Sequence, residues 1–293
     1  MFTGFIYDDA NNYYDYDTID IYLTHLKYIC NNDEKAYNYF EGWLSHIIQQ
    51  PEQKTLTAMV FYSIVEGIGK NLVFDIYTEL IKGYSTTFRD TEALTDRFNG
   101  DMVGKLFVLG DEINARAQEV ANELKNIITR EKEIVELKGK DKYQVNDYKN
   151  YAFTTNNENV FKVSNSDRRF VFIECPEEKK DTEYYKKLVE FKNSPTCLKQ
   201  LFNYFKTKDI SNFNPRDIPI TDYKKRLIWA NLEAYIKFVY DEFNNIEGVR
   251  FNTNTLYKMS IDYAKNNKMK STYTEDLFSK ELQKSIWRFS KKN

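Results

Sequence analysis

The stretch FYSIVEGIGKN, residues 61–71, decides the fold class of this chain. It continues an apolar run, residues 56–65, whose short length and β-branched and aromatic side chains are typical of a buried strand. Gly67 and Gly69 then allow the backbone to turn tightly and to approach a ligand closely. The stretch therefore predicts a strand that leads through a glycine turn into a helix.

The helix predicted after this turn opens with Lys70 and Asn71 and ends at Gly83. A strand, a glycine loop and a helix that starts with lysine suit phosphate binding, because N–H groups at the helix start point at the anion and lysine adds a charge. The full phosphate-loop pattern is G-x-x-x-x-G-K-[ST], and two positions depart from it. Ile64 occupies the first glycine position, and Asn71 replaces the hydroxyl residue that holds Mg²⁺. On this stretch alone, a plain strand-to-helix turn remains an alternative.

Composition limits the remaining possibilities. The 293 residues are 42% hydrophobic and 16% aromatic, which is enough for a large core, and the net charge of −2 provides no global basic field for nucleic acid. Cys30, Cys175 and Cys197 lack metal-site spacing and fit a reducing compartment. His25 and His46 lie in helical patterns and are interpreted as structural. No apolar run approaches the length of a membrane span, so we expect a cytoplasmic protein. The opening residues look like the continuation of a preceding segment, so the chain is expected to be a piece of a longer protein.

A second short apolar run, residues 105–110, ends in Asp111 and Glu112. Beside a phosphate loop, such a strand supplies the second half of an ATPase site: the Asp orients Mg²⁺ and the Glu polarises the attacking water. A buried strand that simply reaches the surface at two acidic residues is the common alternative.

Three further features follow along the chain. Residues 133–145 alternate around a turn and predict a β-hairpin with Lys138, Lys140 and Lys142 near its tip, which is either a solvated turn or a finger that touches a nucleic-acid backbone. Residues 151–156 form a strand that ends in Asn156, which is a turn residue or an amide placed beside a phosphate. The pair Arg168-Arg169 precedes another apolar run and is either solvated or able to reach a phosphate of a neighbouring subunit.

The order of these motifs resembles the superfamily-3 helicases of viruses, phages and plasmids, and it is most similar to the helicase part of phage and plasmid primase–polymerases. The resemblance covers residues 40–175 well and the C-terminal third only loosely. It implies an AAA+-like P-loop NTPase core, an α/β fold that assembles as a homo-oligomer, usually a hexameric ring, around single-stranded DNA.

Carried over position by position, the resemblance implies a role for each motif. The nucleotide loop comprises Glu66, Gly67, Ile68, Gly69, Lys70 and Asn71. The catalytic set is Lys70, Asp111, Glu112, Asn156 and Arg168 or Arg169, with Arg169 favoured because it directly precedes an aromatic residue. Asn71 and Asp111 hold Mg²⁺, and Lys138, Lys140 and Lys142 face the DNA. The cofactors implied are ATP and Mg²⁺.

Helical patterns flank this core. We expect an N-terminal helical region over residues 1–50, the ATPase core over residues 51–178, and a mainly helical, winged-helix-like or lid domain over residues 179–293. The N-terminal region contains two helices, one capped by Asp17 or Thr18 and one by Asn32 or Asp33.

The sequence therefore predicts an ATPase and DNA helicase module of a viral or phage replication protein, fused to or working with a primase–polymerase. A non-hydrolysing scaffold that oligomerises or holds DNA is the main alternative, since the loop is degenerate. A small-molecule kinase has no use for the lysine hairpin.

Overall fold

The computed structural model describes residues 2–9, 11–89, 100–115, 117–159, 161, 163–164, 166–243, 252–271 and 273–280. The chain divides into two compact units, Met1–Leu227 and Ile228–Asn293. The first is built on a β-sheet, and the described parts of the second are helical.

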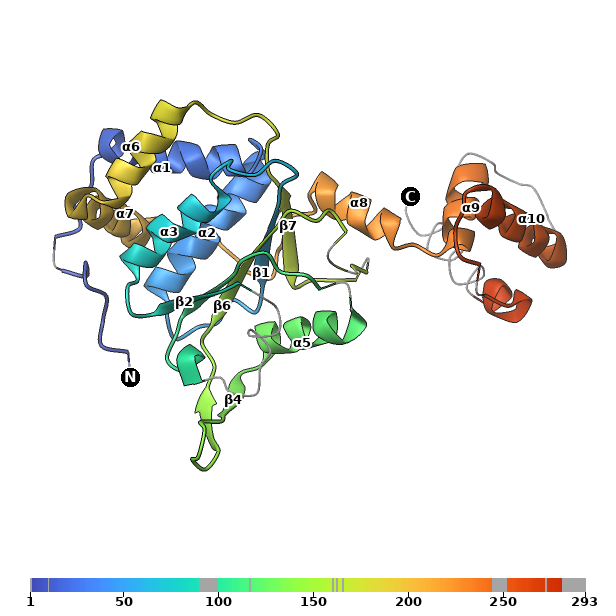
Figure 1. The fold of residues 1–293 in the computed structure, drawn as a ribbon, viewed down its shortest axis with the longest axis horizontal. Coiled ribbons are helices and arrows are strands. Elements are labelled where there is room, and N and C mark those ends of the chain that lie inside the picture. The colour runs from blue at the N-terminus through green and yellow to red at the C-terminus, as the bar shows by residue number, and fades with distance from the viewer. Residues whose placement is uncertain are drawn as a thin grey trace. The chain divides into compact units, whose positions relative to one another are not determined.

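A five-stranded parallel sheet forms the centre of the first unit (Figure 1). The sheet order is β2 (Ser85–Phe88), β3 (Phe107–Gly110), β6 (Asn150–Thr155), β1 (Ala58–Tyr62) and β7 (Phe170–Glu174). Strand β1 is buried along its whole length between β6 and β7, which explains its continuous apolar sequence. Because all five strands are parallel, the loops that follow β1, β3 and β6 meet at one edge of the sheet.

Helices cover both faces of this sheet. Figure 1 shows α5 (Gln118–Thr129) on one face and a layer of helices on the other. This layer comprises α1 (Tyr16–Ile29), α2 (Glu34–Gln49), α3 (Lys70–Leu80), α6 (Thr182–Lys192) and α7 (Pro195–Thr207). Alternate strand residues such as Met59 and Phe61 belong to the same apolar core as these five helices. The predicted α/β architecture with a buried strand before the glycine loop is confirmed.

The first helix begins earlier than the sequence predicted. Asp15 caps α1, since its carboxylate accepts hydrogen bonds from the Thr18 amide (3.2 Å) and hydroxyl (2.9 Å). Asp17 and Thr18 therefore lie inside the helix, and the predicted cap at either position is wrong. Asp33 caps α2, in agreement with one of the two predicted positions.

The sequence pattern from residue 113 to residue 128 predicts a helix, but α5 starts only at Gln118. Glu112 has a φ of +56°, which interrupts regular structure directly after β3. The Ile113 amide donates to the Thr154 carbonyl at 3.1 Å, and Ala115 forms a bridge with Phe161. This segment therefore follows neighbouring backbone before it becomes helical.

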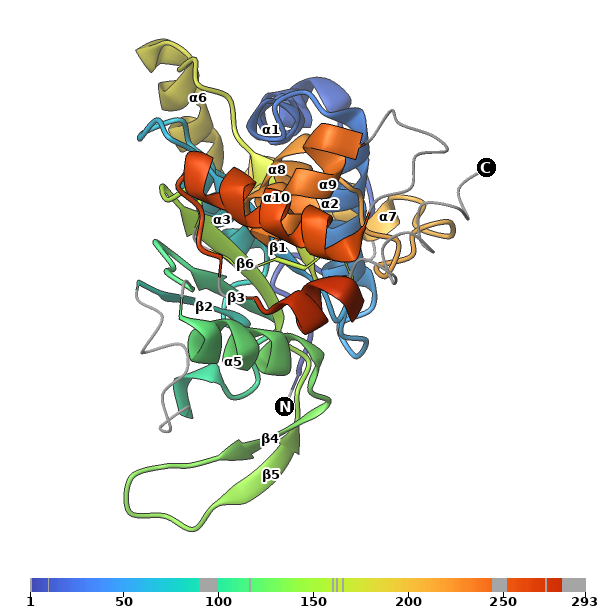
Figure 2. The same ribbon diagram turned by 90° about the vertical axis from the view of Figure 1, so that its right-hand side faces the viewer.

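The predicted lysine hairpin is present. Strands β4 (Lys132–Val135) and β5 (Tyr143–Asn146) pair antiparallel, and Figure 2 shows them extending beyond the sheet. Gly139, at the turn, has a φ of +75°, a conformation that favours glycine. A short 3-10 helix, η1 (Gly100–Met102), precedes β3.

Helix α8 (Asp222–Ala230) spans the boundary between the units, and α9 (Ala234–Phe243) and α10 (Thr253–Asn266) follow it. The sequence pattern of residues 227–243 predicts a single helix. The chain instead turns between Ala230 and Ala234, where the amides of Asn231 and Leu232 bond back to the last turn of α8. The sequence pattern also predicts a helix over residues 273–289. Residues 275–280 are helical, and residues 281–289 lie outside the described residues. Within its described parts this unit contains no strand, so those parts lack the hairpin of a winged helix.

The division of the chain differs from the one expected at residues 50 and 178. Helices α1, α2, α6 and α7 share one apolar core with the sheet, because their buried faces pack against α3 and the strands. Only residues 228–293 form a separate compact unit. No helix in the described ranges combines the length and the apolar character needed to cross a membrane.

Candidate functional site

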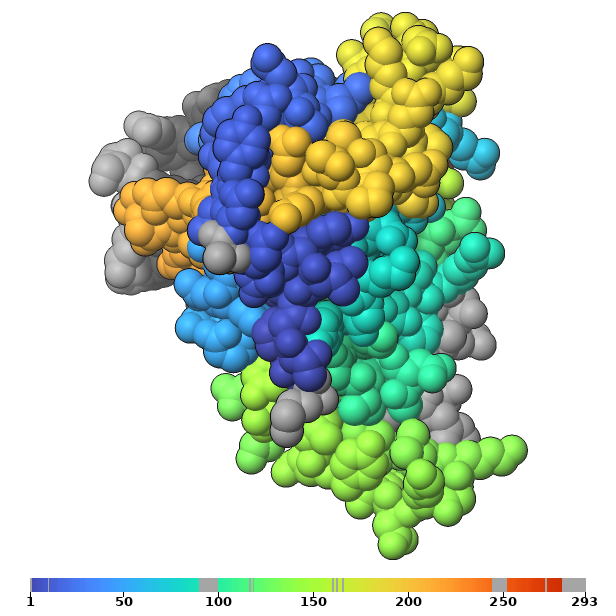
Figure 3. Space-filling view, turned by 90° about the vertical axis from the view of Figure 1, so that its left-hand side faces the viewer, coloured from blue at the N-terminus to red at the C-terminus, as the bar shows by residue number. Residues whose placement is uncertain are grey.

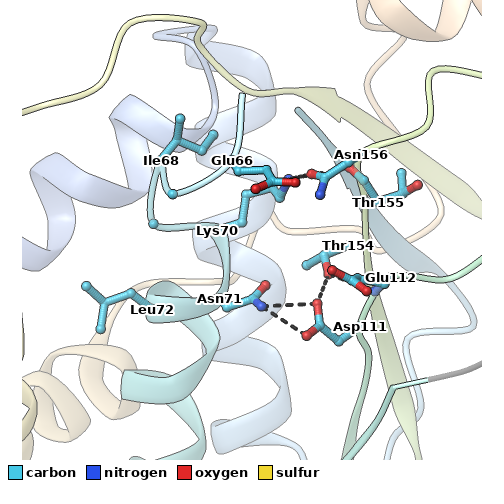
Figure 4. Close-up of a pocket in the computed structure, with 12 residues that line it drawn as sticks. Glu66, Ile68, Lys70, Asn71, Leu72, Asp111, Glu112, Thr154, Thr155 and Asn156 are labelled. Carbon is cyan, nitrogen blue, oxygen red and sulfur yellow. Dashed lines mark hydrogen bonds between the residues drawn. The ribbon is translucent and has the colours of Figure 1, made fainter. Parts of the chain in front are cut away.

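The loops after β1, β3 and β6 enclose a pocket of about 300 Å³ at the carboxyl edge of the sheet. It brings together most of the predicted site residues, as Figure 4 shows. The lining residues are Glu66, Gly67, Ile68, Gly69, Lys70, Asn71, Leu72, Asp111, Glu112, Thr154, Thr155 and Asn156. These segments are distant in sequence and meet only because β1, β6 and β3 are adjacent and parallel.

The glycine loop presents a free helix end to this pocket. Gly67 and Gly69 have φ values of +72° and +89°, so both positions use the conformational freedom of glycine. Gly69 occupies the N-cap position of α3, and no side chain caps that helix. Uncapped N–H groups at a helix start, together with the helix dipole, attract an anion.

The lysine that follows already contacts the opposite wall. Lys70 Nζ donates to Asn156 Oδ1 at 2.5 Å and to the Thr155 carbonyl at 3.4 Å. Burial lowers the pKa of the Lys70 ammonium. A phosphate group would replace neutral oxygens as its partner, and an ammonium group is attracted more strongly to a charged oxygen than to a neutral one.

A second cluster joins α3 to the end of β3. Asn71 Nδ2 donates to both carboxylate oxygens of Asp111, at 3.1 and 3.0 Å. The Thr154 hydroxyl donates to Asp111 Oδ1 as well. Carboxylate, hydroxyl and amide oxygens are the donors that Mg²⁺ prefers, and this set fits a cation completed by water and phosphate. For Asn71 to contribute its oxygen, its amide must turn over.

Glu112 is held in an unusual backbone conformation. Its φ of +56° is uncommon for a residue with a side chain. Two hydrogen bonds stabilise this conformation: the Glu112 amide donates to Thr154 Oγ1 at 3.4 Å, and the Ile113 amide donates to the Thr154 carbonyl. Strained residues of this kind cluster at functional sites. Glu112 lines the pocket, and its side chain lies beside Asp111 and Thr154 (Figure 4).

The structure explains one departure from the phosphate-loop pattern. Ile64 is 65% exposed, and its φ is not positive. The Ser63 side chain shapes this part of the loop instead, since its hydroxyl donates to the Val65 carbonyl at 2.6 Å. Isoleucine at this position therefore causes no conformational strain in the loop.

His25 supports the loop from behind. Its Nε2 lies 3.1 Å from the Gly69 carbonyl oxygen, and its Nδ1 lies 3.2 Å from the Tyr184 hydroxyl. Burial lowers the pKa of His25 to about 4, so the ring is neutral at pH 7. A neutral ring that donates from Nε2 to the carbonyl accepts the Tyr184 hydrogen at Nδ1. A Cβ on Gly69 would approach His25 Nε2 to 2.6 Å, so this position requires glycine.

The remaining predicted residues lie elsewhere. Arg168 and Arg169 precede β7, at the amino edge of the sheet, about 16 Å from the pocket by strand rise. Arg168 is exposed, whereas the Nε atom of Arg169 is buried without a hydrogen-bond partner among the described residues. Lys138, Lys140 and Lys142 are exposed on the hairpin, which also lies at the amino edge. The structure therefore does not bring these five residues into the pocket of the same chain.

Sequence reasoning missed two side chains that shape the site. Thr154 bonds to Asp111 and to the Glu112 amide, yet only Asn156 was singled out in that strand. Thr154 lies one residue before the end of β6, and its position carries no distinctive pattern. The contact of His25 with the loop had no sequence signal at all, since 44 residues separate it from Gly69.

Together, the parallel sheet, the glycine loop at a helix start and the acidic end of β3 define a P-loop-like α/β domain. Residues 61–169 match a family of unknown function (DUF5906), a match that covers just over a third of the chain and includes all three pocket loops.

Comparison with known proteins relates the chain to a phage protein. It is 28% identical over 157 residues to the DNA primase-polymerase of Nitratiruptor phage NrS-1. The matched segment covers 52% of this chain and 22% of the phage protein. Its fold matches the apo structure of the NrS-1 C-terminal region with a TM-score of 0.70 and 19% identity, over 89% of this chain and 66% of that one. The chain thus spans about a fifth of the phage protein and about two thirds of the solved region. A JCV helicase matches at a TM-score of 0.38, with 11% identity over 84% of this chain and 66% of that one, which is too low to support a conclusion.

Proposed function

We propose that this chain is the ATP-dependent helicase module of a phage or viral replication protein, of the superfamily-3 type. The observation that carries the proposal is the convergence of Lys70, Asp111, Glu112 and Asn156 on one pocket at an uncapped helix start. Phosphate loops, acidic strand ends and a polar strand end are the parts that phosphoryl transfer from ATP requires. The similarity to a phage DNA primase-polymerase supports a place in DNA replication.

Each pocket residue has a role in this proposal. The loop amides and Lys70 bind the phosphates of ATP, with Lys70 exchanging its bond to Asn156 for one to phosphate. Asp111 and Asn71 hold Mg²⁺, which neutralises phosphate charge when bound. Glu112, which lines the pocket beside Asp111, orients and polarises the attacking water.

Distance from the pocket supports a site completed by a neighbouring subunit. Arg168 is too far from the pocket of its own chain, so it serves a second copy, as expected for a homo-oligomeric ring, with a hexamer as the expected form. Exposure favours Arg168 over Arg169, because the Arg169 Nε atom is buried within its own chain. The exposed lysines Lys138 and Lys140 contact the phosphates of single-stranded DNA.

The test measures ATP hydrolysis with and without single-stranded DNA, and records the oligomeric mass in the same samples. Lys70→Ala and Glu112→Gln are the informative variants, and Lys186→Ala, whose side chain is 65% exposed on α6, is the control. We expect DNA-stimulated hydrolysis in the wild type and the control, and its loss in both pocket variants. Unchanged hydrolysis in Lys70→Ala would overturn the proposal.

One observation favours the alternative, a ring or scaffold that binds DNA without hydrolysis. Asn71 turns its amide nitrogen, not its oxygen, toward Asp111, so that the two side chains satisfy each other. An assembled ring that binds DNA but shows no hydrolysis, and no Mg²⁺-dependent nucleotide binding in a titration, would select this alternative.

A further inference from the structure

A groove of about 540 Å³ lies at the amino edge of the sheet, beside the base of the lysine hairpin. We call it the hairpin groove. It shares no residue with the pocket at the carboxyl edge. The residues that define it here are Lys132, Gln144, Asn146, Tyr148, Val103 and Leu106.

The strand register explains why one wall of the groove is polar. Lys132 pairs with Asn146, and Ile134, which is 60% exposed, pairs with Gln144, so the three polar side chains and Ile134 share one face of the hairpin. Lys132, Gln144 and Asn146 are all exposed there. Glu133, on the opposite face, is buried. The hairpin thus offers a cation and two amides on a single surface.

The other wall is apolar and partly aromatic. Leu106 is buried and Val103 is half-buried beside it. Tyr148 is 38% exposed, and its hydroxyl accepts a hydrogen bond from Asn146 Nδ2 at 3.0 Å. An accessible ring next to amide and ammonium groups is the combination that binds a base, a sugar and a phosphate of a single strand.

Buried charges anchor the groove to the sheet. Asp147 accepts from Lys54 (3.1 Å), Arg130 (2.9 Å) and Lys149 (2.9 Å), and Glu133 accepts from Arg130 (2.7 Å) and Lys149. Three cations therefore surround two carboxylates at the base of the hairpin. The excess positive charge favours an anion nearby, and the many ion pairs hold the groove in a fixed shape.

We propose that the hairpin groove binds a nucleotide of a single-stranded nucleic acid. The base stacks on Tyr148, Gln144 and Asn146 hydrogen-bond to its edge or sugar, and Lys132 contacts the adjacent phosphate. This inference rests on the proposed contact of the hairpin with DNA, and it extends that contact from the lysine tip to the base of the hairpin. Figure 3 shows the hairpin, in light green, projecting from the body of the first unit. A nucleic-acid strand can therefore reach the hairpin from the solvent.

The experiment measures binding of a short, fluorescently labelled deoxythymidine oligomer to the full chain by anisotropy, at several salt concentrations. We expect Tyr148→Ala to weaken binding roughly 5- to 100-fold, because stacking is lost, and Tyr148→Phe to bind like the wild type. Lys132→Ala is expected to reduce the slope of log affinity against log salt by about 0.7. Lys186→Ala is the control for a lysine far from the hairpin.

The double variant Lys138→Ala with Lys140→Ala separates this inference from the proposed function. If the tip variant weakens binding while Tyr148→Ala and Lys132→Ala bind like the wild type, the groove assignment is overturned and the hairpin contact stands. If neither the tip nor the groove variants weaken binding, both fail. If Tyr148→Ala changes the oligomeric mass instead of DNA affinity, the groove is an interface between copies of this chain, and the nucleotide assignment is overturned.

Discussion

Acidification should destabilise the first unit through His25. The pKa of this ring is about 4 in the folded chain, against 6.5 for a free histidine, because burial disfavours its charged form. Between these two values the unfolded chain binds a proton that the folded chain does not, so the free energy of unfolding falls as the pH falls from about 6.5 to about 4. The free energy of unfolding is therefore higher above this pH window, where the His25 ring is neutral in both the folded and the unfolded chain.

The size of the effect follows from the shift. A difference of about 2.5 pKa units corresponds to about 3 kcal/mol once both states are titrated, and to about 2 kcal/mol between about pH 7 and about pH 5. The loss is measured by urea unfolding at a series of pH values. His25→Gln is the matched variant, because its amide can still donate to the Gly69 carbonyl but does not titrate.

We expect the pH dependence of His25→Gln to be shallower than that of the wild type by this amount. His46→Gln is the control: burial also lowers the pKa of His46, but the variant keeps the titration of His25. Equal pH dependence in wild type and His25→Gln would refute the reasoning, since no proton uptake would then be linked to His25.

Three further predictions concern other parts of the first unit. Glu133→Gln should lower the free energy of unfolding by about 3–5 kcal/mol, because it removes one of the carboxylates that pair with the buried Lys149. Glu136→Gln should lower it by under about 1 kcal/mol, because the partner of Glu136, Lys142, is exposed. Urea unfolding of both variants measures the difference. Gly69→Ala should abolish nucleotide binding in a titration and lower the stability measured by thermal unfolding by at least about 1 kcal/mol. The added Cβ would lie 2.6 Å from His25 Nε2, and the position has a positive φ. Nucleotide affinity equal to that of the wild type would contradict this prediction. Mixing Lys70→Ala chains with Arg168→Ala chains, each expected to be inactive alone, should restore part of the ATP hydrolysis. At half of the mixed interfaces, the intact loop of one chain meets the intact Arg168 of the other. No recovery in assembled mixtures would argue against a site shared between subunits.

Local chemistry in the sequence was sufficient to predict most elements of the first unit. Residues 56–65 are apolar and β-branched, Gly67 and Gly69 allow positive φ, and Lys70 opens a helix, so strand, turn and helix follow from properties of adjacent residues. The hairpin around Gly139 was predictable for the same reason. Boundaries were less certain where a contact distant in sequence decided them. The Ile113 amide bonds to the Thr154 carbonyl of β6, and Ala115 forms a bridge with Phe161, instead of extending a helix.

Tertiary structure alone decided how the motifs combine. Strand order places Asp111 and Thr154 beside Asn71, and no local pattern specifies which parallel strands become neighbours. The parallel direction of β7 puts Arg168 at the opposite, amino edge of the sheet, away from the pocket of its own chain.

The sequence by itself thus determined the elements and the residue types of the candidate site, because helix caps, glycine turns and apolar periodicity act between neighbours in the chain. Only the tertiary structure decided that His25 supports Gly69, that Ile64 causes no strain in the loop, and that a groove opens at the hairpin base. These features depend on packing between segments tens of residues apart, and packing is set by the shape of the whole core.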